Sequence, residues 1–148
     1  MKHIILFLFL ITFSISAFAQ FPLGSDRGQI KAYFAENIPY ASVQQFKAEN
    51  GANGLCFTKV KVVGDYTFYF DYYGKCSSYV VTYDNSELPE VITRFDSEFC
   101  REEMARWSAH DKTFDVTLVR PTNGENFFSM IYKPASASML PTNALAAN

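Results

Sequence analysis

The sequence predicts an α+β domain: an antiparallel sheet, made of a three-stranded meander plus a C-terminal hairpin, packed against one long helix, with a shorter N-terminal helix. First, the stretch 55–83 contains three apolar and aromatic runs separated by two glycine-containing turns. Second, apolar residues recur at helical spacing before and after this stretch. Third, two alternating runs lie near the C-terminus. Runs of strands interrupted by a helix are typical of α+β domains.

The chain of 148 residues divides into a leader, one domain and a tail. Residues 1–19 combine a basic start, an apolar core and an A-x-A site, which is typical of a cleavable secretory signal peptide. We expect one α+β domain over 20–134 and a disordered tail over 135–148, which is small, polar and aperiodic. The predicted protein is therefore secreted or periplasmic, with no transmembrane segment after cleavage. The alternative is that the leader stays in place as a membrane anchor.

The first predicted element of the domain is a helix over 26–37. Asp26 and Gln29 have the spacing of a capping box, in which each side chain accepts a hydrogen bond from the other's backbone. Pro39 ends the helix, because the residue before a proline avoids the α region. The next segment, 42–47, is a candidate edge strand that pairs with the first strand of the meander.

The two turns of the meander predict its register. Residues 61–65 and 71–75 each have glycine at the fourth position and opposite charges at the ends, as in a three-residue hairpin loop. This pairing places one apolar set on a single face: Cys56, Val60, Tyr66, Phe68, Phe70, Cys76 and Val80. The opposite face then includes three tyrosines, Tyr69, Tyr79 and Tyr83.

The long helix should begin after Asn85 and cover the apolar face of the meander. One apolar stripe extends to Phe99, and a second stripe, Cys100, Met104 and Trp107, is rotated by roughly 100° from it. The helix therefore either buries two sides or breaks near 99–101. We expect it to end at His110, followed by a hairpin of strands over 114–119 and 127–133.

The sequence contains no catalytic motif. The predicted mature chain contains one histidine, His110, so sites built from two or three histidines are excluded. No nucleophile elbow, C-x-x-C, P-loop or dinucleotide fingerprint is present. We assign no catalytic residue, metal ligand or cofactor, and we interpret His110 as a polar residue near a helix C-terminus. Hydrolysis by His110 or by paired carboxylates is the enzymatic alternative.

The three cysteines suggest one disulfide, because secretion exposes the protein to oxidising conditions. Cys56 and Cys76 would lie two strand spacings apart, about 9.6 Å, which is too far for a disulfide. The long helix would carry Cys100 back over Cys76. We therefore predict a Cys76–Cys100 bridge, with Cys56 free and buried.

Composition favours a binding function. The formal net charge is −2, or −3 without the one lysine of the leader, so nucleic acid is a poor candidate partner. An exposed patch of Tyr69, Tyr79 and Tyr83 would suit a protein or saccharide partner, unless the N-terminal helix covers it. The favoured function is a secreted or periplasmic binding module of unknown ligand. A small secreted hydrolase and an envelope-associated structural protein are the alternatives.

Overall fold

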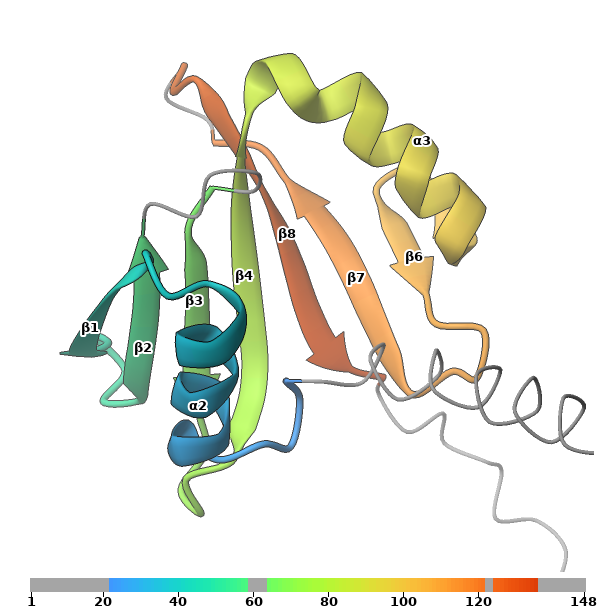
Figure 1. Cartoon of the computed structure of the whole chain (residues 1–148). Coiled ribbons are helices and arrows are strands. Elements are labelled where there is room, and N and C mark those ends of the chain that lie inside the picture. Colours follow the sequence, from blue (N-terminus) through green and yellow to red (C-terminus); the bar gives the residue numbers. More distant parts are fainter. Residues whose placement is uncertain (1–21, 59–63, 122–123, 136–148) are drawn as a thin grey trace, which may run out of the picture.

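The computed structural model describes residues 22–58, 64–121 and 124–135. Within these ranges the chain forms two α-helices, α2 (Arg27–Asn37) and α3 (Leu88–Glu98), and a sheet of eight antiparallel strands (Figure 1). The strands are β1 (Ser42–Lys47), β2 (Asn53–Thr58), β3 (Tyr66–Phe70), β4 (Cys76–Asp84), β5 (Cys100–Glu103), β6 (Arg106–Ser108), β7 (Phe114–Val119) and β8 (Phe127–Pro134). The predicted α+β class is confirmed. The predicted signal peptide and nearly all of the predicted tail lie outside the described residues.

The described part of the chain contains a topological repeat that the sequence did not reveal. The strand order is β1-β2-β3-β4-β8-β7-β6-β5, so each half is a helix followed by a four-stranded meander. The last strands of the two halves, β4 and β8, pair at the centre of the sheet. Both helices have 11 residues, and each buries its fourth and eighth positions: Ile30 and Phe34 in α2, and Val91 and Phe95 in α3.

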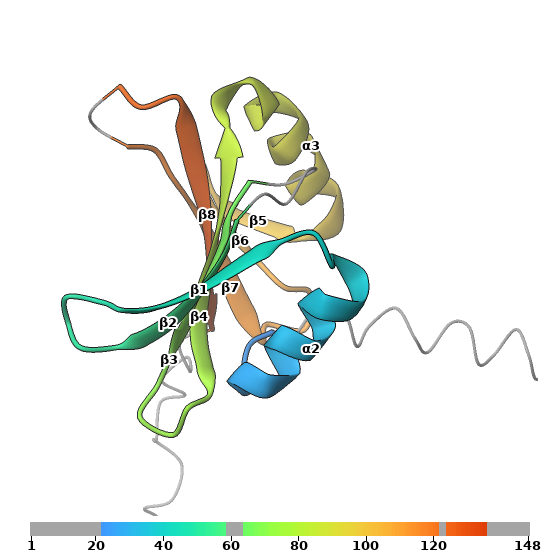
Figure 2. The same cartoon turned by 60° about the vertical axis from the view of Figure 1, so that its left-hand side comes forward.

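The molecule has two layers. Both helices lie on one face of the sheet, which we call the inner face, and no described helix covers the opposite, outer face (Figure 2). Buried apolar side chains of the strands and both helices form one core. Its largest fully buried members are Trp107, Phe68, Phe95, Phe128, Ile30, Leu55, Met130, Val81 and Val116.

The predicted N-terminal helix is confirmed together with its cap. The backbone N–H of Gln29 donates to Asp26 Oδ1 and the N–H of Asp26 donates to Gln29 Oε1, both at 2.9 Å. Phe34 on the buried side of α2 stacks on Phe57 with ring centroids 3.9 Å apart. The candidate edge strand is also confirmed, because β1 pairs with β2 along its whole length.

The predicted turn between β3 and β4 is correct, but the register beyond it is wrong. Gly74 has a φ of 74°, as the predicted loop requires, and Phe70 pairs with Cys76. A β-bulge then makes Phe68 pair with Tyr79 instead of Ser78. One extra residue moves every later side chain of β4 to the other face of the sheet, which is why this correction matters for the site.

The pairing predicted for β2 is wrong as well. Leu55 faces Phe68 and Phe57 faces Tyr66, so these two β2 residues lie on the inner face and Cys56 lies on the outer one. The turn predicted over 61–65 falls largely outside the described residues. Its glycine, Gly64, lies so close to β4 that a Cβ there would be 1.9 Å from the carbonyl oxygen of Thr82.

The second helix is shorter than the predicted long helix and ends at Glu98. Phe99 has extended backbone, with φ −131° and ψ 163°, and the following residues form the β5–β6 hairpin. Trp107, expected on a rotated helical stripe, is instead a strand residue that packs on Phe95 and donates from Nε1 to Asp96 Oδ1 at 2.8 Å. Of the two alternatives left by the sequence, a break near 99–101 is therefore the correct one. The helical continuation to His110 is wrong, and the final hairpin of β7 and β8 is confirmed.

Candidate functional site

The three predicted binding tyrosines do not share a face. Tyr79 and Tyr83 lie in the core on the inner face, with 8% and 5% of their surfaces exposed. Tyr69 lies on the outer face, half-buried, with its ring edge-on to Phe46 at 5.7 Å. The β3–β4 bulge separates them, so the patch expected from the simple register is not formed.

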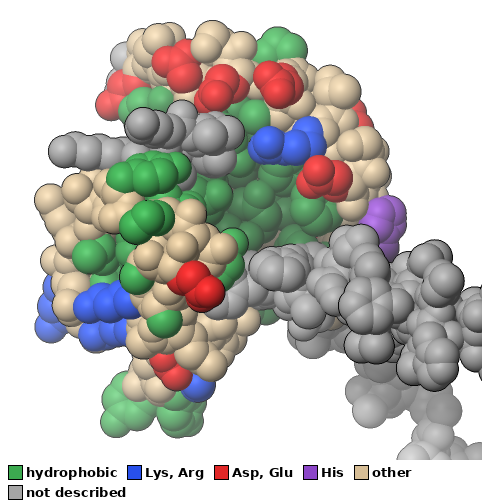
Figure 3. Space-filling model, in the orientation of Figure 1, with side chains coloured by type: hydrophobic (Ala, Val, Ile, Leu, Met, Phe, Trp, Pro, Cys, Tyr) green, Lys and Arg blue, Asp and Glu red, His purple; other side chains and the backbone are tan. Residues whose placement is uncertain are grey.

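A different group of tyrosines gathers on the inner face. We call Tyr66, Tyr79, Tyr83 and Tyr132 the tyrosine cluster; they come from strands β3, β4 and β8. The rings of Tyr79 and Tyr132 stack across the central strand pair with centroids 4.2 Å apart. Figure 3 shows a hollow between the two helices with apolar side chains on its floor. The cluster therefore lies where the two halves of the repeat meet.

Burial and mutual proximity keep the phenols of the cluster protonated. Loss of solvation raises the pKa of all four, and that of Tyr83 reaches about 12. Neighbouring tyrosines of the cluster contribute to the rise at Tyr79, Tyr83 and Tyr132. The positive charge of Arg94, on α3, lowers the pKa of Tyr66, Tyr83 and Tyr132, but less than burial raises it.

Arg94 supplies a cation beside the cluster. Its Nη2 donates to the hydroxyl of Tyr83 at 3.2 Å, and its guanidinium carbon lies 5.9 Å from the centre of that ring. Its side chain is exposed to solvent. The exposed guanidinium of Arg94 therefore lies above an apolar floor, where it can hydrogen-bond a carbonyl or a carboxylate.

A cavity of about 160 Å³ adjoins the cluster under α2. Its lining residues are Pro22, Tyr33, Phe34, Ile38, Tyr66, Phe68 and Tyr79. Sites for drug-sized ligands are larger, at roughly 300–1,000 Å³, so this cavity suits a single apolar group the size of a side chain. We call the cluster, Arg94 and this cavity together the inner groove.

Sequence reasoning found two members of the cluster and missed Tyr132 and Arg94. Tyr132 was predicted only as part of the last strand, and nothing in its local pattern shows that this strand pairs with β4. Arg94 was given no role, because a single arginine within a predicted helix matches no motif. The missing information is the pairing of β4 with β8. Its partners, such as Val81 and Met130, lie 43 or more residues apart in the sequence.

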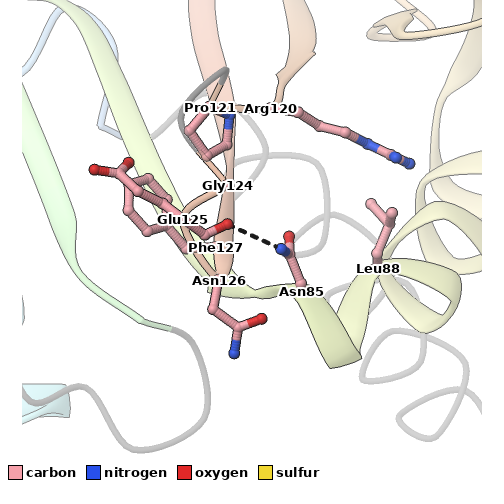
Figure 4. A pocket seen from close by; sticks show the side chains of 8 residues that line it. All are labelled: Asn85, Leu88, Arg120, Pro121, Gly124, Glu125, Asn126 and Phe127. Atoms are coloured by element: carbon pink, nitrogen blue, oxygen red, sulfur yellow. Dashed lines mark hydrogen bonds between the residues drawn. The ribbon is translucent and has the colours of Figure 1, made fainter.

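Two other pockets lie away from the groove. One of about 430 Å³ lies between the start of α3 and the β7–β8 loop, where Asn85 Nδ2 donates to the carbonyl of Glu125 at 3.2 Å (Figure 4). The other, about 360 Å³, lies on the outer face beside the Arg106–Asp115 ion pair. Neither these two pockets nor the inner groove contains His110 or two facing carboxylates.

All three cysteines are free thiols, so the predicted Cys76–Cys100 bridge is wrong. Cys100 begins β5 at the edge of the sheet, four strands away from Cys76 on β4. Four strand spacings of about 4.8 Å give a separation near ~19 Å, well beyond the ~7 Å that a disulfide allows. The error follows from the predicted long helix, which would have carried Cys100 back over β4.

The same correction brings Cys100 to His110, which the sequence left unconnected. Their Sγ and Nδ1 atoms lie 3.1 Å apart because the β5–β6 hairpin folds the chain back on itself. Among the described residues, no three His, Cys, Asp or Glu side chains are arranged to hold a metal ion. None of the described helices is both long and apolar enough to cross a membrane. A scan of protein-family models and searches of curated proteins and of solved structures found nothing that matches this chain.

Proposed function

We propose that this protein is a small secreted or periplasmic binding module, and that its ligand site is the inner groove. The observation that carries the proposal is that Tyr66 and Tyr79 of the cluster line an apolar cavity, while the neighbouring Tyr83 accepts a hydrogen bond from the exposed Arg94. A mostly apolar concavity with a few convergent polar groups is the usual form of a binding site. The location outside the cytoplasm rests on the leader sequence alone.

The groove favours a protein partner over a saccharide. Its cavity has room for one apolar side chain, while Arg94 and the hydroxyls can bond the backbone or an acidic group of the same segment. Saccharides stack on open faces of aromatic rings, whereas Tyr79 and Tyr132 stack on each other and Tyr83 stacks on Phe128. The expected ligand is therefore a polypeptide that inserts an apolar side chain next to a carboxylate.

Two small probes test this site on the purified, uniformly ¹⁵N-labelled mature protein. N-acetylphenylalanine has an aromatic group beside a carboxylate, and its neutral amide lacks the charge. We expect both probes, at millimolar concentration, to shift the backbone amide signals of Phe68 and Tyr79. The carboxylate probe should bind several-fold more tightly, because a charged hydrogen bond to Arg94 contributes about 1.5–3 kcal/mol before solvation losses.

Three variants sharpen the test. Arg94→Gln should remove the difference in affinity between the two probes. Ile38→Trp fills the rim of the cavity and should abolish binding of both probes. Tyr69→Ser changes the outer face and serves as the matched control, so its probe affinity should equal that of the unchanged protein. Signal shifts confined to the outer face, or equal affinity of all variants, would refute the proposed site.

A further inference from the structure

A thiol and an imidazole meet on the outer side of the β5–β6 hairpin. Cys100 Sγ lies 3.1 Å from His110 Nδ1, within hydrogen-bonding distance for sulfur. Cys100 faces Ser108 across the strand pair, and His110 follows Ser108 by two residues. β6 ends at Ser108, and the turn that follows it brings the His110 ring beside Cys100. A nucleophile within reach of a base is the basic unit of covalent chemistry in proteins.

Lys112 adds positive charge to this thiol–imidazole pair. Its Nζ bonds the carboxylate of Glu102 and donates to Ser108 Oγ at 2.8 Å. The hydrogen bond that Lys112 donates to Glu102 is the main reason why the pKa of Lys112 is raised, and the nearby Cys100 contributes further. The left-handed backbone of Lys112, with φ 56°, turns its side chain back over the hairpin.

The charges around the pair come from three segments: β5, the turn that follows β6, and β7, where Asp115 pairs with Arg106. On β5, Glu102 is neutralised by Lys112. In the turn that follows β6, Asp111 accepts hydrogen bonds from the N–H and hydroxyl of Thr113. Lys112 is paired with Glu102, so the imidazole of His110 is the group in contact with the sulfur that can take its proton.

The other two cysteines provide internal comparisons. Cys76 is 2% exposed, and burial raises the pKa of its thiol to about 12. Cys56 is half-buried, as Cys100 is, but its sulfur lies 3.6 Å from the hydroxyl of Thr67 instead of an imidazole. The chain thus contains one buried thiol, one accessible thiol beside a hydroxyl and one accessible thiol beside a base.

We propose that Cys100 is a reactive thiol that exchanges with disulfides, and that His110 is its base. His110 Nδ1 takes the thiol proton, and the Cys100 thiolate attacks one sulfur of a disulfide. A bond forms between Cys100 Sγ and that sulfur as the original S–S bond breaks. The departing thiolate then takes the proton from the His110 imidazolium, so the exchange needs no other oxidant.

Disulfide exchange fits this place better than acyl transfer. None of the three pockets described above adjoins the pair, whereas exchange requires only that a disulfide sulfur can reach the thiolate. The proposed chemistry concerns the outer face and is independent of binding in the inner groove.

Single-thiol proteins test the proposal with 4,4′-dithiodipyridine, a small disulfide whose released thiopyridone is followed by absorbance. The two double variants are Cys56→Ser with Cys76→Ala, which keeps Cys100, and Cys76→Ala with Cys100→Ser, which keeps Cys56. At about pH 6.5 an ordinary thiol is only about 1% ionised. Because His110 can take the proton of Cys100, whereas the neighbour of Cys56 is a hydroxyl, Cys100 should react at least about tenfold faster than Cys56.

The variant His110→Gln separates base assistance from simple access. In the Cys100-only protein it should lower the rate at about pH 6.5 by roughly tenfold, and change the rate at about pH 9.5 by less than about twofold, because thiols ionise there without help. Equal rates for Cys100 and Cys56 at the lower pH, or an unchanged rate in His110→Gln, would overturn the proposal.

A second measurement does not require the substitution of the buried Cys76. The protein with all three cysteines is treated with the same reagent for a short time at about pH 6.5, and the labelled peptides are identified by mass. Cys100 should be modified first and Cys76 last. Modification of Cys56 before Cys100 would refute the inference.

Discussion

The two halves of the molecule share a topology and differ in the outer sides of their first hairpins. In the N-terminal half, Phe46 of β1 covers Gly54 of β2 so closely that a Cβ on that glycine would lie 2.1 Å from the ring. In the C-terminal half, the β5–β6 hairpin carries an ionic chain, in which Lys112 bonds Glu102, beside the Cys100–His110 pair. The two halves thus share their strand topology although the side chains on the outer sides of these hairpins differ.

The inner faces differ in how each helix is held. Phe34 of α2 packs on aromatic rings of the sheet, with Phe68 edge-on at 5.6 Å. Phe95 of α3 packs on Trp107 at 5.7 Å, and the same indole also bonds Asp96 of the helix. The inner groove belongs to neither half, because its cluster is assembled across the β4–β8 pair.

The largest expected effect comes from substitutions in the core. They test whether the two halves of the molecule fold as one unit. Phe68→Ala and Trp107→Ala should each destabilise the protein by about 3–5 kcal/mol, since both side chains are fully buried. In urea, each variant should unfold in a single transition with a lowered midpoint. Two separate transitions, only one of them shifted, would show that the repeat consists of independent units.

Alkaline pH should destabilise the junction between the halves. The pKa of Cys76 rises from 9.0 and that of Tyr83 from 10.0, each to about 12, so the folded state keeps protons that the unfolded state releases. Their contribution to stability is complete below about pH 9 and is lost as the pH rises to about 12. Urea midpoints should therefore fall steeply over this range. Constant midpoints from pH 8 to about 11 would contradict the buried environment of the cluster.

Two glycines of the N-terminal half should differ in their tolerance of a methyl group. Gly64→Ala forces backbone against backbone, because the new Cβ would lie 1.9 Å from the oxygen of Thr82, and we expect a loss of about 1–3 kcal/mol. At Gly54 the obstacle is the tip of the Phe46 ring, which can rotate away. Gly54→Ala should therefore cost less than Gly64→Ala in denaturant unfolding, and the reverse order would contradict the close packing of Gly64 on β4.

The smallest effect is expected for the ionic outer side of the C-terminal half. Lys112→Ala removes an exposed ion pair and should change the free energy of unfolding little, and by even less at high salt. Phe46→Ala, at the outer hairpin of the other half, should cost more, about 1–2 kcal/mol, because it uncovers apolar surface. Equal losses in thermal unfolding would show that the two outer sides stabilise the fold alike.

Features that depend on neighbouring residues were predicted correctly from the sequence. The cap of α2 requires only Asp26 and Gln29, and the β3–β4 turn requires only the glycine and charged residues of 71–75. The alternation over 114–119 likewise predicted strand β7 without knowledge of its partners. In each case the backbone hydrogen bonds or side-chain period that define the element lie within a few residues of one another.

The sequence by itself determined the α+β class, the N-terminal helix, the meander and the final hairpin, because local patterns specify these elements. Only the tertiary structure decided the β3–β4 bulge between Tyr69 and Phe70, the end of α3 at Glu98 and the pairing of β4 with β8. At each of these places the local sequence allows more than one structure of similar energy. Burial of side chains that are distant in the sequence, such as Trp107, decides between them. The tyrosine cluster and the Cys100–His110 pair both result from those choices, which is why neither was visible in the sequence.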